Sequence, residues 1–133
     1  YAASFDKGGN TKYLHTIVQA FIDGRNLITS ANGEALTDSQ RSELRAYAQV
    51  IKTQWECLIA EAVFKYAGSV YGDIEKLETI IATNGDVVKV YRTYAKHWGE
   101  LKGFALALET GGVNLGETGV KMNRLLGYSP VLL

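Results

Sequence analysis

The residues of this sequence that are best suited to chemistry are a histidine and a glutamate three positions apart, His97 and Glu100, in the segment HWGE. On a helix, residues with this spacing lie one turn apart on nearly the same face, so the imidazole and the carboxylate can share a metal ion or a proton. A protein metal site generally has three or four side-chain ligands, so this pair needs at least one more, from Glu61, Glu56 or a residue outside the chain. We therefore predict His97, Glu100 and Glu61 as candidate metal ligands, with iron or zinc as the candidate ion.

The same pair also has a purely structural interpretation, which we favour. His97 lies within an apolar stripe, where a histidine commonly serves the core and hydrogen-bonds to a neighbour, here Glu100, Tyr94 or Gln54. In that case the chain by itself holds no cofactor. The sequence lacks the water-activating base beside a closed ligand set that HExxH supplies to peptidases, and it lacks a phosphate-binding glycine loop. We predict no catalytic residues, no cofactor-binding residues and a role that is not enzymatic.

The helix that carries this pair is predicted over residues 86–110, because apolar residues recur there at alternating steps of three and four. Asn84 or Asp86 is placed to cap its first turn, and Gly111-Gly112 is expected to supply the left-handed residue with which many helices end. The stripe, with His97 in its middle, consists of Val87, Val90, Tyr94, Leu101, Phe104 and Leu108.

The same periodicity predicts two further long helices, over residues 11–31 and 37–67, and two short ones, over residues 73–82 and 115–126. A capping box, Thr37-Asp38-Ser39-Gln40, opens the second long helix, and Gly68 and Gly72 are expected to end it. The first nine residues show little periodicity and are predicted to form a loop or a segment that pairs with a missing part of the protein. Arg25 interrupts the stripe of the first helix, with its guanidinium either in water or paired with a buried carboxylate.

These elements predict an all-α fold, an antiparallel helical bundle of three long helices with one or two short ones. No segment shows the period-two alternation of a half-buried strand. Three long amphipathic helices leave a bundle incomplete, so we expect residues 1–133 to form a single helical domain that is half of a larger bundle. Its partner is then a missing N-terminal part, another protein chain or a second copy.

The composition narrows the classes of partner. The 133 residues are 47% hydrophobic and 21% charged, which is typical of a folded domain rather than of a disordered chain. Fourteen basic and fourteen acidic residues give a formal net charge of zero, which argues against nucleic acid and anionic membranes as partners. No apolar run approaches the roughly 18 residues of a transmembrane helix. The single cysteine, Cys57, is expected to be a small buried side chain.

The segment Ala95–Glu109, AKHWGELKGFALALE, resembles an uncharacterised bacterial family of all-helical envelope proteins, often lipid-anchored, which is distantly similar to the imelysin-like proteins of iron uptake. The resemblance extends to FIDGR at residues 21–25, to Trp55-Glu56 with Tyr66 downstream, and to the closing LLGYSPVL. It covers most of this chain and the C-terminal part of that family.

Imelysins carry a GxHxxE motif suspected of binding metal. His97 and Glu100 match the histidine and glutamate of this motif, whereas Ala95 replaces its glycine. The resemblance implies export to the periplasm or to the outer membrane surface of a bacterium, with any export signal or lipid anchor lying upstream of Tyr1.

Two functions from different classes stay open at this point. The first is a non-catalytic helical binding module of the bacterial envelope, linked to the uptake of iron or another metal. The second is a structural or assembly module that docks its apolar helix faces onto a partner chain. An imelysin-like metallopeptidase is a more remote third candidate, because the sequence offers no complete metal site.

Overall fold

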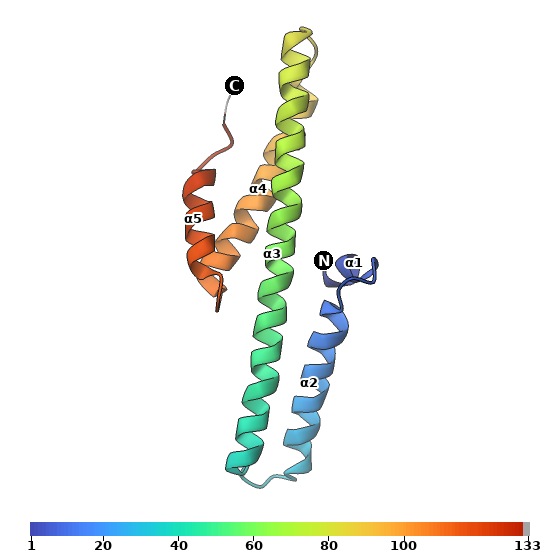
Figure 1. Cartoon of the computed structure of the whole chain (residues 1–133), viewed down its shortest axis with the longest axis vertical. Coiled ribbons are helices and arrows are strands. Elements are labelled where there is room, and N and C mark those ends of the chain that lie inside the picture. Colours follow the sequence, from blue (N-terminus) through green and yellow to red (C-terminus); the bar gives the residue numbers. More distant parts are fainter. Residues whose placement is uncertain (132–133) are drawn as a thin grey trace. The chain divides into compact units, whose positions relative to one another are not determined.

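The computed structural model describes residues 1–131, and in that range it contains helices and no strands (Figure 1). The predicted all-α fold with antiparallel helix packing is therefore confirmed. The last two residues lie outside the described range: Leu132, with which the closing LLGYSPVL ends, and Leu133. The helices are α1 (Ala2–Asp6), α2 (Tyr13–Ser30), α3 (Asp38–Ala82), α4 (Val87–Gly111) and α5 (Gly116–Leu126).

The longest element, α3, is one continuous helix of 45 residues, so the predicted end at Gly68 and Gly72 is wrong. A glycine inside a helix costs only about 1 kcal/mol relative to alanine. Apolar packing continues across both glycines, since Tyr66 on one side and Leu77 on the other are buried. This burial outweighs the low helix propensity of two glycines, and the separate helix predicted over residues 73–82 is the last part of α3.

The N-terminal residues also differ from the prediction, because residues 2–6 form the short helix α1 instead of a loop. The last residue of α1, Asp6, caps the first turn of α2 although it lies outside that helix. Its Oδ1 accepts from Thr11 Oγ1 at 2.7 Å and from the Tyr13 amide at 2.9 Å. Its Oδ2 accepts from the Leu14 amide at 2.8 Å. Desolvation raises the pKa of the Asp6 carboxyl, but the three hydrogen bonds together lower it further, so the net shift is downward.

Helix ends follow the predicted capping chemistry at two places. In the capping box, the Thr37 amide donates to Gln40 Oε1 at 2.9 Å and the Gln40 amide donates to Thr37 Oγ1 at 3.2 Å. The Asp86 carboxylate caps α4 by accepting from the Val88 amide at 3.0 Å. The left-handed ending predicted for α4 is wrong, because Gly112 leaves the helix in an extended conformation with φ −69°.

By its internal contacts the chain divides into two compact units, Tyr1–Leu58 and Ile59–Leu133, with the division inside α3. In the first unit, α2 packs antiparallel to the beginning of α3. The two helices approach closely at Gly24, where an added Cβ would lie 3.3 Å from Leu44 Cδ1 and 3.8 Å from Tyr47 Cδ2. The assignment of residues 1–133 to a single domain stays a prediction.

In the second unit, the rest of α3 packs antiparallel to α4. The Tyr66 ring stacks on the Phe104 ring with centroids 5.8 Å apart and an interplanar angle of 13°. Val63, Tyr66, Leu101 and Leu108 form the buried cluster between the two helices, and Leu115, Met122 and Leu126 extend it toward α5.

The last helix, α5, lies against the end of α4. Lys102 Nζ donates to the Asn123 carbonyl at 3.1 Å, and Asn123 Nδ2 donates to Glu109 Oε2 at 2.6 Å. Beyond α5, the Val131 amide donates to the Tyr94 hydroxyl at 3.0 Å and ties the following segment to α4. None of the helices in the described part of the chain combines the length and apolar character needed to cross a bilayer.

Candidate functional site

The histidine singled out from the sequence, His97, is hydrogen-bonded across the second unit to an aspartate of α3. His97 Nδ1 lies 2.6 Å from Asp73 Oδ2. The Asp73 side chain is only 3% exposed and that of His97 is 25% exposed. The other oxygen, Asp73 Oδ1, lies 3.6 Å from Lys76 Nζ. Both oxygens of the buried carboxylate therefore face a nitrogen.

The hydrogen bond to Asp73 fixes how the imidazole can be used. An ionised carboxylate only accepts hydrogen bonds, so His97 Nδ1 is the donor and a neutral ring keeps its lone pair on Nε2. Carboxylates that hold one ring nitrogen in this way orient metal-binding histidines in many proteins. The Tyr66 ring, with its centroid 6.0 Å from that of His97, stands on the α3 side of the pair.

The second predicted ligand, Glu100, lies one helical turn after His97 on α4, as the sequence predicts. Its Oε2 is buried and has no hydrogen-bond partner. A buried carboxylate oxygen without a donor is unusual, because the desolvation cost is normally offset by a hydrogen bond or a cation. His97 Nε2 and the Glu100 carboxylate are therefore two groups with lone pairs that can bind a cation or a proton.

The third predicted ligand, Glu61, is not brought to this pair. It precedes Asp73 by twelve residues on the same continuous helix, which places it about 18 Å away along the helix axis. Since the hydrogen bond places His97 level with Asp73, Glu61 is too far along α3 to share a ligand with it. Among residues 1–131, no group of three or more histidine, cysteine, aspartate or glutamate side chains is arranged to hold a metal ion. The metal role of His97 and Glu100 stays a prediction.

The partner Asp73 is the residue that the sequence analysis missed. The sequence analysis names Glu100, Tyr94 and Gln54 as hydrogen-bond partners of His97, and it places Asp73 at the start of a separate short helix. On a continuous α3, Asp73 follows Tyr66 by seven residues and precedes the buried Leu77 by four, so it lies within the apolar stripe. The sequence does contain a signal for this partner: Asp73 is an acidic residue at helical spacing from two apolar residues, Tyr66 and Leu77, that are buried.

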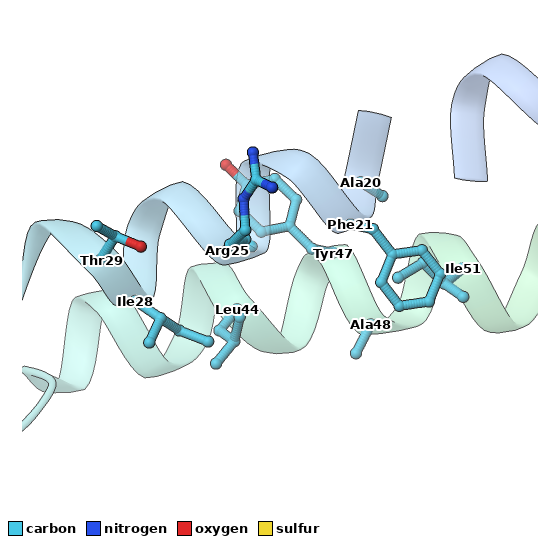
Figure 2. A pocket seen from close by; sticks show the side chains of 10 residues that line it. Ala20, Phe21, Arg25, Ile28, Thr29, Leu44, Tyr47, Ala48 and Ile51 are labelled. Carbon is cyan, nitrogen blue, oxygen red and sulfur yellow. The ribbon is translucent and has the colours of Figure 1, made fainter. Parts of the chain in front are cut away.

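A second candidate site is an apolar groove of about 400 Å³ between α2 and the first part of α3 (Figure 2). Most of its lining is aliphatic or aromatic. Arg25 borders it with its side-chain stem, and in Figure 2 the guanidinium points away from α3, which agrees with the first of the two interpretations given for this residue. The lining residues are Ala20, Phe21, Gly24, Arg25, Ile28, Thr29, Leu44, Tyr47, Ala48 and Ile51.

The groove continues into a stripe of exposed apolar side chains on α2. Leu14, Val18, Phe21 and Ile28 recur at steps of three, four and seven, so they lie on one face, and each is between 44% and 58% exposed. On α3, Trp55 follows Ala48 by seven residues and is 53% exposed. This face of the first unit therefore presents large apolar side chains to the solvent.

Comparisons of the chain with models of known protein families, with curated proteins and with solved structures give no match.

Proposed function

We propose that this protein is a non-catalytic helical docking module that binds a partner chain through the apolar groove between α2 and α3. The observation that carries the proposal is the groove itself, which is lined almost entirely by apolar side chains and flanked by exposed ones. The apolar stripe of α2 is wider than its contact with α3 covers, because the groove residues Phe21 and Ile28 stay 58% and 53% exposed.

The exposed area is large enough for binding. A fully exposed large apolar side chain presents on the order of 150 Å² or more, so Leu14, Val18, Phe21, Ile28 and Trp55 together expose roughly 400 Å². Apolar patches of this size on soluble proteins commonly mark interaction sites. Covering the patch is worth about 10 kcal/mol before the cost of association is subtracted, which supports a reversible complex.

The test uses an amphipathic peptide of about 18 residues, with leucine at helical spacing on one face and glutamine on the other, long enough to be helical when bound. Binding of the fluorescently labelled peptide to the whole chain is measured by anisotropy. Ala48→Asp places a carboxylate inside the groove and should weaken binding about tenfold or more. The matched control is Ala46→Asp, two residues away on the same helix and outside the groove lining, which should leave binding unchanged. Equal effects of the two substitutions, or no peptide binding at all, would contradict the proposal.

A second candidate function, metal handling, is favoured by the buried Glu100 Oε2 that lacks a hydrogen-bond partner. Here His97 Nε2 and the Glu100 carboxylate would supply two ligands, and the remaining ligands would come from water or a partner. The protein is titrated with iron or zinc and its metal content measured. Tight binding that is abolished by both His97→Ala and Glu100→Gln, with the helical circular dichroism unchanged, supports this function. Metal-free protein after titration excludes it.

The resemblance to bacterial envelope proteins adds a proposed location to either function, the periplasm or the outer membrane surface. Fractionation of the native bacterium tests the location without reference to the binding assays, and a cytoplasmic fraction would contradict it.

A further inference from the structure

The two edges of the α2–α3 pair differ in charge. On one edge lie Asp23 of α2 and Glu43 of α3, each two residues before a cation of the groove edge (Arg25 and Arg45) and so on the other side of its helix. The ring of Tyr47 lines the groove, and its hydroxyl donates to Glu43 Oε1 at 2.6 Å. The hydrogen bond to Glu43, desolvation and the nearby charges of Glu43 and Asp23 raise the pKa of Tyr47. This edge therefore brings two carboxylates, one from each helix, to the same tyrosine.

The other edge, which contains the groove, carries cations. Arg25 lines the groove on the α2 side. On the α3 side, Arg45 precedes the groove residue Ala48 by three positions and Lys52 follows it by four, so both share its helix face. All three basic residues are exposed. The apolar floor is thus bordered by positive charge along both of its sides.

This charge pattern selects among occupants. A second copy of the chain that placed its own groove face against this one would bring two basic rims together, and like charges across an interface disfavour association. A partner with carboxylates on both sides of an apolar stripe would instead meet Arg25 on one rim and Arg45 and Lys52 on the other. Concave apolar grooves between two helices commonly take a third helix, whose anchors recur at three and four residues.

We propose that the groove binds an acidic amphipathic helix of a partner protein, with the apolar stripe of that helix on the groove floor and its aspartate or glutamate residues against the two basic rims. The inference rests on the docking function proposed above and adds the chemical class of the partner. One exposed pair of opposite charge contributes little, but several together distinguish an acidic from a basic helix by about tenfold or more.

The experiment compares three peptides with the same leucine stripe, in which the flanking positions are all glutamate, all glutamine or all lysine. On the wild-type chain at low salt we expect the glutamate peptide to bind about tenfold more tightly than the lysine peptide, with the glutamine peptide between them. The difference should shrink as salt is raised, because exposed charges are screened. The double charge reversal Arg25→Glu with Lys52→Glu should reverse the order of the peptides. The matched control, Lys89→Glu with Arg92→Glu on α4, changes the net charge equally and should preserve the order.

The outcomes separate this inference from the proposed function. Equal binding of the glutamate and lysine peptides, still weakened by Ala48→Asp, overturns the acidic partner and leaves the docking function standing. Absence of binding by all three peptides overturns both. Sedimentation of the chain alone that shows a dimer disrupted by Ala48→Asp overturns the inference in favour of a second copy. Binding to vesicles of anionic phospholipid that is lost on Ala48→Asp, without preference for the glutamate peptide, overturns it in favour of a membrane surface.

Discussion

Gly119 of α5 offers a sharp test of the packing between α4 and α5. An ideal Cβ on Gly119 would lie 2.4 Å from the Glu109 amide nitrogen and 2.9 Å from both Glu109 Cα and the Leu108 carbonyl carbon. All three atoms belong to the backbone of α4, so no side-chain rotation relieves the overlap. Ordinary contacts of a Cβ begin at 3.4 Å, so Gly119→Ala forces α5 to retreat by about 1 Å.

The energetic cost follows from what such a retreat disturbs. Overpacking of a core typically costs about 1–3 kcal/mol. The retreat also strains the hydrogen bonds of Asn123 to Glu109 and Lys102, and a buried polar group that loses its partner adds about 1–3 kcal/mol. The higher helix propensity of alanine returns about 1 kcal/mol. We therefore expect Gly119→Ala to lower the free energy of unfolding by about 1–5 kcal/mol.

Urea denaturation followed by far-ultraviolet circular dichroism measures this change, and amide hydrogen exchange shows whether α5 alone has detached. The matched control is Gly68→Ala in α3, where the added Cβ meets no atom within 4 Å and should stabilise the helix by about 0.5–1 kcal/mol. If Gly119→Ala were as stable as the control and α5 kept its exchange protection, the close approach of α4 and α5 would be refuted.

Two further predictions concern buried or capping carboxylates. Asp73→Ala should cost about 2–4 kcal/mol, because it leaves the partly buried imidazole of His97 without its partner. In a double-mutant cycle by urea denaturation, Asp73→Ala combined with His97→Ala should cost less than the two single losses added, and strict additivity would contradict the pairing. For Asp6, whose pKa is lowered in the folded state, the stabilisation is fully present above the ordinary value of 3.8 and is lost as pH falls through the lowered pKa. Protection of the Tyr13 and Leu14 amides against exchange should therefore fall in acid, and in Asp6→Ala it should be low at every pH; wild-type protection that does not change with pH would argue against the cap.

Periodicity in the sequence predicts α2, α4 and α5 to within about two residues at each end. These helices are amphipathic, so their apolar residues recur at steps of three and four. This pattern is visible within each segment and does not depend on contacts with distant residues. The capping box at Thr37 and the cap at Asp86 were equally readable, because a cap is made by residues adjacent in sequence. Local periodicity therefore predicts the all-α fold class, and local capping residues predict where two of the helices begin.

The parts that could not be predicted depend on contacts between distant residues. Gly68 and Gly72 are residues that commonly end a helix, and α3 continues through them because Tyr66 and Leu77 on either side are buried in tertiary packing. Gly119 is likewise a glycine that the local sequence does not distinguish, yet an added Cβ there would meet the backbone of α4. The pairing of Asp73 with His97 needs both the continuity of α3 and the antiparallel alignment of α4, and neither is encoded in a local pattern.

That alignment gives the Asp73–His97 pair a consequence for misfolded states. Most residues in the cluster between α3 and α4 are apolar, so sliding α4 by one turn, about 5.4 Å, would still bury apolar side chains. The same slide would remove the imidazole from a carboxylate that is 3% exposed and leave a buried polar group without that partner. We therefore expect the pair to disfavour misaligned packings of α4 on α3 in addition to its contribution to the native state. Replacing both residues by leucine should keep the helices but permit several alignments, visible as multiple sets of methyl resonances where the wild type shows one.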